Sequence, residues 1–187
     1  MAEKLKRRGV AALIALAAML HTLFASGGAK LSALRSEAEN VFFSGEKGDG
    51  LSIYGDLNTR LDCAYNLGTI ARRSGMEGRK ELEAAMSAYD ALVRALNEGA
   101  PKPSLAALNR DLTAAVETLY RAMEGQGLSD TDEDLAVRQY RNFLSANDTI
   151  SHDSYNLHAA AFNQTLAAFP ANVIALFAGI SPLDYFR

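Results

Sequence analysis

The chain has 187 residues, of which 49% are hydrophobic and 22% are charged, and its formal net charge is −3. This length predicts one domain with a sizeable core, and the apolar fraction excludes a disordered chain. One cysteine excludes a disulfide framework, and three histidines leave little for a metal centre, so no cofactor or metal is expected.

Positive charge is concentrated at the start of the chain. Residues 1–8 form a basic N-terminal segment with four Lys or Arg residues and one Glu, a net charge of +3. Because the whole chain carries −3, the remainder carries −6. Binding to a phosphate backbone requires clustered Lys and Arg, which this acidic remainder lacks. No nucleic-acid partner is therefore expected.

Residues 9–28 are expected to form a transmembrane or signal-anchor helix. No charge occurs from Gly9 to Ala25, which at 1.5 Å per residue covers about 25 Å, slightly less than the ~30 Å hydrocarbon core. We favour a retained single-pass anchor, with the lipid bilayer as partner. The alternative is a signal peptide cleaved at the small residues 25–27, which would release a secreted helical protein. In both cases the basic flank predicts that residues 29–187 lie outside the cytoplasm.

Residues 29–187 are predicted to form an antiparallel bundle of long helices, which makes the fold all-α. Apolar residues recur at helical spacing between glycine-rich breaks. The predicted stripes are Leu31, Leu34, Ala38 and Val41/Phe42, in a helix that continues from Ala29 to Phe43; Leu57, Leu61, Ala64, Leu67 and Ala71; Leu82, Met86, Tyr89, Val93 and Leu96; and Leu105, Leu108, Leu112, Val116, Leu119 and Met123.

The fourth and fifth stretches have predicted starts. Ser104 and Ser129 are the predicted N-caps, because a serine hydroxyl accepts a hydrogen bond from a free N–H of the first turn. Acidic residues that favour the helix N-terminus follow Ser129. No glycine or proline then occurs before Pro170, so the last helix is predicted to run for about 40 residues.

An aromatic residue followed by Asn or Pro recurs every seven residues near the end of this helix. The three pairs are Tyr155-Asn156, Phe162-Asn163 and Phe169-Pro170. We interpret the aromatic residues as core side chains and the two asparagines as amides that bond to a neighbouring helix and fix its register. A ligand site built from the asparagines is the alternative. Asn→Leu would preserve stability if the amides only set register, and would lower it by several kcal/mol if they complete a required network.

These pairs resemble the closing motif of the LemA family. Arg60, Asp62 and the pair Asn66-Leu67 are similar to a second pattern of that family, and the apolar N-terminal helix also fits. Residues 63–65 and the inserted SGEKGDG at 44–50 depart from the family, which indicates a divergent branch.

The resemblance implies a membrane-anchored helical bundle of the bacterial cell envelope whose molecular activity is undefined. The motif residues are then structural, and they are Arg60, Asp62, Asn66, Tyr155, Asn156, Phe162, Asn163, Phe169 and Pro170. Family members are usually drawn with the N-terminus outside the cytoplasm, opposite to the orientation that the basic flank predicts. We retain the charge argument, because the basic residues flank the membrane helix that sets the orientation.

The sequence contains none of the catalytic motifs that we sought, so no catalytic residue is assigned and an enzyme is not expected. The acid–base candidate His152-Asp153 is interpreted as an exposed pair, and Cys63 as a small buried thiol. The favoured function is a non-catalytic scaffold or interaction protein, with a protein partner of unknown identity or a second copy of the chain. The alternatives are a ligand-sensing module with a pocket near Asn66, Asn156 and Asn163, and an enzyme of unrecognised type.

Overall fold

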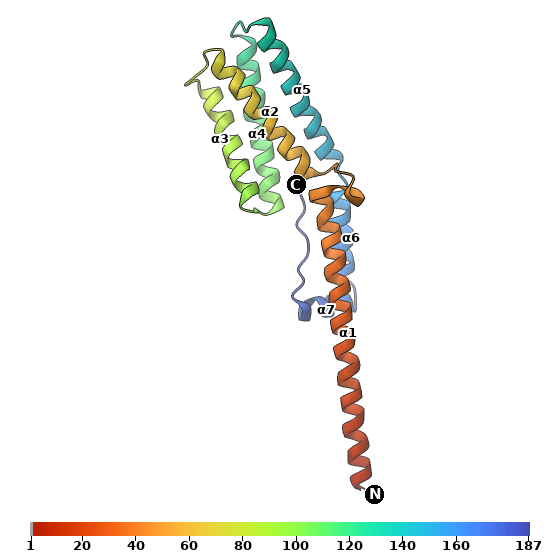
Figure 1. The fold of residues 1–187 in the computed structure, drawn as a ribbon. Coiled ribbons are helices and arrows are strands. Elements are labelled where there is room, and N and C mark those ends of the chain that lie inside the picture. Colours follow the sequence, from red (N-terminus) through yellow and green to blue (C-terminus); the bar gives the residue numbers. More distant parts are fainter. Residues whose placement is uncertain (1) are drawn as a thin grey trace. The chain divides into compact units, whose positions relative to one another are not determined.

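The computed structural model describes residues 2–187, and the side chains of residues 10–19 and 21–187 (Figure 1). Every regular element in this part of the chain is a helix, which confirms the all-α class. The elements are α1 (Ala2–Ser44), a 3-10 turn (Glu46–Gly48), α2 (Ile53–Arg73), α3 (Lys80–Asn97), α4 (Lys102–Glu124), α5 (Asp130–His152), α6 (Tyr155–Ala167) and α7 (Ala171–Ala178).

The chain packs as two compact units. Unit 1 consists of Met1–Glu39 and His158–Leu183, and unit 2 consists of Asn40–Leu157 and Asp184–Arg187. The predicted boundary at residue 28 lies inside α1, which is one continuous helix. Each unit therefore combines segments that are distant in the sequence.

Unit 2 is a bundle of the helices α2, α3, α4 and α5 (Figure 1). The helix α2 packs against α3, α4 and α5, and α3 packs against α4. Burying one large apolar side chain contributes roughly 1.5–3 kcal/mol, so the shared core is the main source of stability. Its fully buried side chains include Leu57, Leu67, Leu92, Leu112, Leu119 and Phe143.

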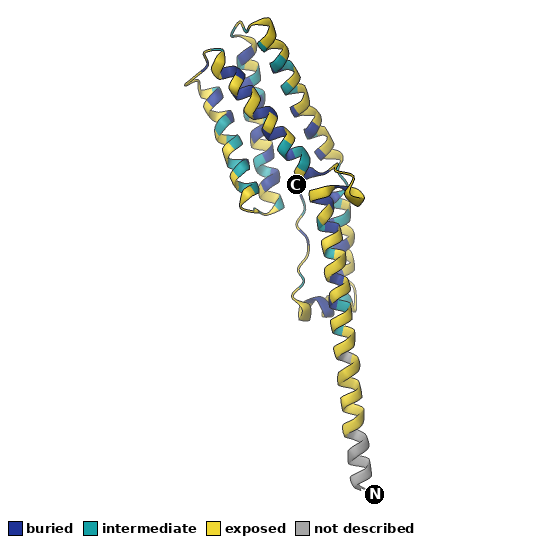
Figure 2. Cartoon of the chain, in the orientation of Figure 1, coloured by how far each residue is buried: buried dark blue, intermediate teal, exposed yellow. Residues whose placement is uncertain are grey.

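The predicted apolar stripes differ in how deeply they are buried (Figure 2). All five residues of the α2 stripe are buried, and so are those of α4 except the half-buried Leu108. In α3 only Leu82 of the predicted stripe is buried, whereas Ala85 and Leu92 reach the core. The alanines of α3 are also apolar, so the sequence pattern does not separate its buried side from the neighbouring positions. This is why the buried residues of α3 differ from the predicted ones.

The glycine-rich stretch at 44–50 is the predicted break, and it contains the 3-10 turn. Gly45 has a φ of 77°, which L-residues rarely adopt. A Cβ at this position would collide with the Asp49 carboxylate and the Leu51 backbone. Glycine at 45 is therefore required for the chain to leave α1 and enter α2.

The predicted final helix of about 40 residues is wrong, because α5 ends at His152 and α6 begins at Tyr155. Asp153 has extended backbone angles (φ −65°, ψ 140°), and its carboxylate accepts the Tyr155 N–H at 2.7 Å. An aspartate side chain competes for backbone N–H groups and favours caps over helix interiors. Asp153 thus ends one helix and caps the next without any glycine or proline.

The two predicted N-caps have different outcomes. Ser129 is confirmed, because its hydroxyl accepts the Asp132 N–H at 3.2 Å. Ser104 is wrong, because α4 begins two residues earlier at Lys102 and its N-cap, Pro101, makes no side-chain cap bond. Pro103 occupies the first turn, where its fixed φ suits the helix and its missing N–H has no cost.

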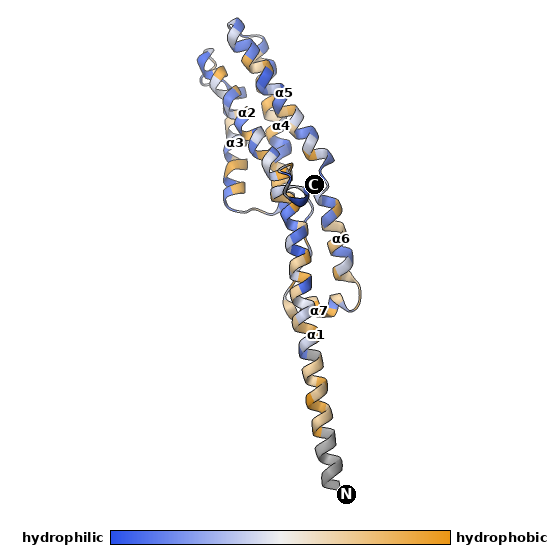
Figure 3. Cartoon of the chain, turned by 45° about the vertical axis from the view of Figure 1, so that its right-hand side comes forward, coloured by the Kyte–Doolittle hydropathy of each residue, from blue (hydrophilic) through white to orange (hydrophobic). Residues whose placement is uncertain are grey.

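Unit 1 is formed by α1, the later turns of α6, and α7 (Figure 1). Leu31, Ala38, Phe162 and Leu166 are buried within it. By contrast, the side chains at 10–19 of α1 are all exposed, and most of them are apolar (Figure 3). One described helical stretch, Val10–Ser44, is long and apolar enough to cross a membrane, and the mean hydropathy of its most apolar 18 residues is 1.9.

Replacing Ser129 with Ala should lower the free energy of unfolding by about 1 kcal/mol, because the Asp132 N–H loses its acceptor. Urea unfolding of the detergent-solubilised protein, followed by circular dichroism, measures this loss. Ser104→Ala is the matched control and should leave stability unchanged or slightly raised, since Ala is the better helix former. Equal losses in both variants would contradict the observed start of α4.

Candidate functional site

In unit 2, the last residues of the chain are held by the start of α6. The Asn156 amide makes two bonds to the peptide groups of Phe186: its oxygen accepts the N–H at 2.8 Å, and its nitrogen donates to the carbonyl at 2.9 Å. The Tyr155 hydroxyl donates to the Asp184 carbonyl at 2.6 Å. The ring of Phe186 lies 5.9 Å from that of Phe42, which also contacts Tyr155 at 5.3 Å. The segment is therefore held by both its backbone and an aromatic side chain.

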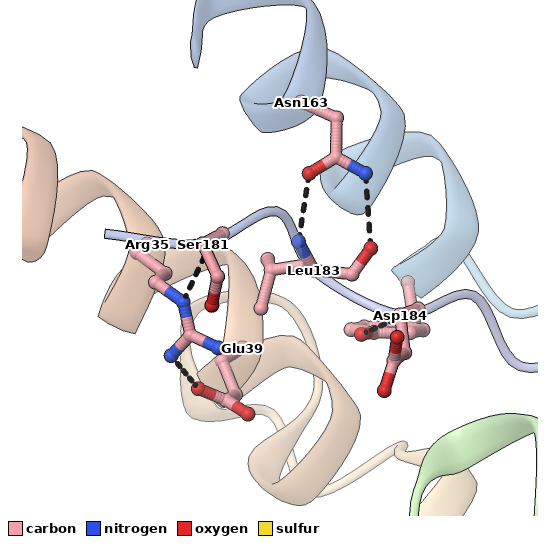
Figure 4. A network of polar contacts seen from close by, with 7 residues as sticks. Arg35, Glu39, Asn163, Ser181, Leu183 and Asp184 are labelled. Atoms are coloured by element: carbon pink, nitrogen blue, oxygen red, sulfur yellow. Dashed lines mark hydrogen bonds and ion pairs between the residues drawn. The ribbon is translucent and has the colours of Figure 1, made fainter. Parts of the chain in front are cut away.

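In unit 1, Asn163 binds Leu183 in the same way (Figure 4). Its amide oxygen accepts the Leu183 N–H at 2.8 Å, and its nitrogen donates to the Leu183 carbonyl at 2.9 Å. Arg35 of α1 donates to the Ser181 carbonyl at 3.2 Å and forms an ion pair with Glu39 at 2.8 Å. Two helices of unit 1 thus supply side chains to one extended stretch of backbone.

The two asparagines therefore act differently from the sequence-based interpretation, which had them bond to a neighbouring helix. Each amide exchanges a donor and an acceptor with a single residue, as two paired residues do in an antiparallel sheet. Asparagine can do this because its amide carries an acceptor and a donor side by side. In each unit the partner lies in residues 180–187, which form no helix or strand and which we call the extended C-terminal segment.

The three aromatic residues of the heptad pattern do not share one environment. Tyr155 and Phe162 are buried, as predicted for core side chains, but Phe169 is 83% exposed. The helix has ended before Phe169, since α6 stops at Ala167 and Pro170 precedes α7. The heptad spacing no longer determines a face once the helix ends, so the core assignment of Phe169 is wrong.

Arg60 is the largest fully buried side chain of unit 2. Its guanidinium lies 4.0 Å above the Phe143 ring and donates to the Thr113 hydroxyl at 2.6 Å, which joins α2 to α5 and α4. Its Nε and second terminal nitrogen have no hydrogen-bond partner among the described residues. Burial lowers the pKa of Arg60 to about 10, because an unpaired charge is disfavoured away from water.

The other motif residues of α2 lie outside this buried layer. Asp62 and Asn66 are exposed, and the Asn66 amide donates to the Gln139 side chain at 3.5 Å. Cys63 is a buried free thiol, as predicted. Burial and the charge of Asp62 raise its pKa, against an opposing effect of Arg60. A thiol with a raised pKa is a poor nucleophile at neutral pH.

A shallow, open pocket of about 200 Å³ lies between α2 and α5 and is lined by Asp56, Thr59, Asn142, Ser145, Ala146 and Thr149. One carboxylate oxygen of Asp56 is buried without a hydrogen-bond partner in the described structure. Burial, followed by the charge of Asp153, raises the pKa of Asp56. Arg60 and Asn109, whose atoms are also unpaired, do not line this pocket. The unpaired groups therefore do not all converge on this pocket.

Within the part of the chain that the structure describes, no group of three or more His, Cys, Asp or Glu residues could hold a metal ion. Of the three asparagines near which the alternative function places a ligand pocket, Asn156 and Asn163 are each engaged by a backbone peptide group, and Asn66 is exposed. The chemistry of these residues is that of backbone binding and polar packing.

Comparison of the chain with protein-family models, with curated proteins and with solved structures finds no match.

Asn156→Leu and Asn163→Leu should each lower the free energy of unfolding by about 1–3 kcal/mol, because each leaves a buried peptide N–H and carbonyl without partners. Thermal melts followed by circular dichroism measure the loss. Asn66→Leu, at an exposed position, is the matched control and should change stability by less than about 0.5 kcal/mol. Unchanged melting of both variants would show that the amides do not hold the C-terminal segment.

Asp56→Asn should raise the melting temperature at pH 7, because it removes a carboxylate charge that burial disfavours. We expect a gain of about 1 kcal/mol or less, since the substitution also loses a favourable charge at the N-terminus of α2. The folded-state pKa of Asp56 is raised, so the cost of its charge disappears as the pH falls through that pKa towards the ordinary value of 3.8. The gain in melting temperature of Asp56→Asn should therefore become smaller as the pH falls. Asp62→Asn is the exposed control, and a gain independent of pH would refute the charge as its cause.

Proposed function

We propose that the chain is a membrane-anchored, non-catalytic helical scaffold or interaction protein of the bacterial cell envelope, related to the LemA family as a divergent branch. The observation that carries this proposal is the exposed apolar stretch of α1. Its large side chains, which include Val10, Leu13, Ile14, Leu16 and Met19, are each at least half exposed. An apolar surface of this extent is costly in water and is satisfied by hydrocarbon.

The dimensions of α1 support a span. Residues 9–29 contain no Asp, Glu, Lys or Arg, and a helix of that length covers about 31 Å, close to the ~30 Å hydrocarbon core. None of the most apolar window is buried within the protein, which supports a membrane helix over the core helix of a soluble bundle.

The packing of unit 1 supports a retained anchor rather than a cleaved signal peptide. Phe24 contacts Phe177 with ring centroids 5.1 Å apart, and Gly27 lies directly against Ile174. Cleavage at the small residues 25–27 would detach part of the surface on which α7 packs. These contacts support retention of residues 24–27 in the folded protein.

The motif residues support the LemA-like assignment through the roles that they have here. Asn156, Asn163 and Tyr155 bond to the C-terminal backbone, and Arg60 joins three helices. Each role is structural, in keeping with a family pattern that specifies a fold. We further propose that α2–α5 run antiparallel, because short connections at 74–79, 98–101 and 125–129 reach only adjacent helix ends.

A scaffold agrees with the site better than a ligand sensor does. Among the described residues, four buried side-chain atoms have no hydrogen-bond partner, and of these only the Asp56 oxygen belongs to a residue that lines the open pocket between α2 and α5. The amphipathic bundle of unit 2 would then present its exposed surface to a protein partner or to a second copy, outside the cytoplasm if the basic flank sets the orientation.

Cell fractionation and thiol labelling test this proposal in a Cys63→Ser background that carries Ser87→Cys on the exposed face of α3. The protein should stay in the membrane fraction after alkaline extraction, and a membrane-impermeant thiol reagent should label it on intact cells. Release into the soluble fraction would overturn the anchor. Labelling only after lysis would place unit 2 in the cytoplasm and favour the family orientation. Replacing Lys4, Lys6, Arg7 and Arg8 with Gln is the control, and it should scramble the labelling if these charges set the orientation.

A further inference from the structure

The corner formed by Phe169, Pro170 and α7 carries a second exposed apolar surface. Phe169, Leu176 and Phe177 are 83%, 80% and 74% exposed, respectively. The opposite side of α7 is also apolar, because Ile174 and Ala175 are buried. The helix is therefore apolar on the side that packs and on the side that is bare, which is unusual for a helix surrounded by water.

Contacts within unit 1 determine where α7 lies along α1. Its Phe177 meets Phe24, and a Cβ on Gly27 would come within 2.8 Å of the Ile174 side chain. A Cβ on Gly28 would come within 3.3 Å of Ala178. The small residues of α1 thus allow α7 to approach closely at 24–28, directly after the exposed apolar stretch. Phe24 is about 22 Å along the helix from Gly9, which is within the ~30 Å thickness of the hydrocarbon.

The orientation of α7 suits the surface of a bilayer. The chain turns sharply after α6, and α7 lies across α1 rather than alongside it (Figure 1). If α1 crosses the bilayer, a helix that lies across it is directed along the membrane plane. Interfacial helices lie in this plane with their apolar side in the boundary between headgroups and acyl chains.

The charge pattern agrees with this placement. Residues 154–183 contain no Asp, Glu, Lys or Arg, so the whole of α7 and its flanks can enter the interface without burying a charge. The first charged residue of α1 after its apolar stretch is Lys30, which is exposed and follows the contact with α7 by two residues. A lysine at this position can extend towards the headgroups.

We propose that the corner of residues 169–178 is a second membrane contact, which inserts Phe169, Leu176 and Phe177 into the interfacial layer of the bilayer that α1 crosses. This inference rests on the proposed function, because it requires α1 to be in the membrane. The corner would then fix the depth and tilt of the anchor, since it joins the spanning helix to the lipid surface at a defined level.

Fluorescence quenching by lipids tests the placement. The full-length Cys63→Ser protein carries a single cysteine, Leu176→Cys, labelled with an environment-sensitive NBD probe, and is reconstituted in vesicles of phosphatidylcholine and phosphatidylglycerol. Some lipids bear a nitroxide near the headgroup end of the acyl chain. Leu176 is so exposed that its replacement leaves the packed side of α7 intact. We expect strong quenching and a blue-shifted emission at this position.

Two control positions on α1 distinguish an error in the proposed placement of α7 from an error in the proposed membrane anchor. Leu16→Cys lies in the proposed span, and Ser36→Cys is an exposed position of unit 1 beyond the contact with α7. Quenching at 16 and 176, several-fold stronger than at 36, supports the inference. Quenching at 16 alone overturns it and leaves the anchor intact, whereas no quenching at either position overturns both. A blue shift at 176 without quenching, together with a disulfide between two copies of the unlabelled Leu176→Cys variant in the presence of copper phenanthroline as oxidant, would assign the surface to a second copy of the chain and also overturn the inference.

Discussion

Both units depend on hydrogen bonds to the backbone N–H and carbonyl groups of the extended C-terminal segment. A buried peptide group outside a helix or sheet must find its partner elsewhere, because leaving it unpaired costs as much as a lost hydrogen bond. Leu183 and Phe186 are buried, and each finds its donor and its acceptor on a single asparagine side chain of α6. Neither aspartate nor leucine could replace both bonds. Because the segment contributes residues to both units, the two asparagines complete unit 1 and unit 2 separately.

The buried arginine of unit 2 shows a second way of joining elements. Arg60 links α2 to the Phe143 ring of α5 and to the Thr113 hydroxyl of α4, and Thr113 in turn donates to the Asn109 carbonyl at 2.8 Å. Such a layer is not an efficient source of stability, since a buried charge loses its hydration. Its contribution is to fix the alignment of the helices, because a polar group at a core position disfavours other alignments of the same apolar helices. This structural role agrees with the proposed scaffold function.

Apolar periodicity predicted α2 and α4 well because their large side chains repeat at three and four residues, which leaves one face to bury. The same spacing contains Arg60, which stands three residues after Leu57 and four before Ala64. Its burial could therefore have been inferred from its position. The break at Asp153 could not, because an aspartate is compatible with a helix interior until its side chain captures a neighbouring N–H.

Only part of the role of Asn156 and Asn163 could be predicted from the sequence. Their spacing of seven residues correctly indicated one face of a helix, but no periodicity describes the partner, which has no regular structure. One signal was available: seven residues of helix rise about 10.5 Å, and three residues of extended or polyproline-like chain cover about 9–10 Å. Leu183 and Phe186 are three apart and follow Pro182. A pair of asparagines at this spacing beside a short apolar tail is therefore a pattern that can be sought in other chains.

The composition of unit 1 from Met1–Glu39 and His158–Leu183 has a consequence for biosynthesis. Its two parts are separated by the whole of α2–α5, and the bond between Arg35 and Ser181 joins residues 146 positions apart. During translation, α1 leaves the ribosome long before the residues that will cover Gly27 and Gly28 have been made. The residues of α1 on which α7 packs are therefore uncovered while α7 has not yet been made. If α1 is the proposed anchor, its apolar stretch enters the bilayer during this interval. Unit 1 is then assembled last, by closing a long loop whose entropic cost grows only with the logarithm of its length.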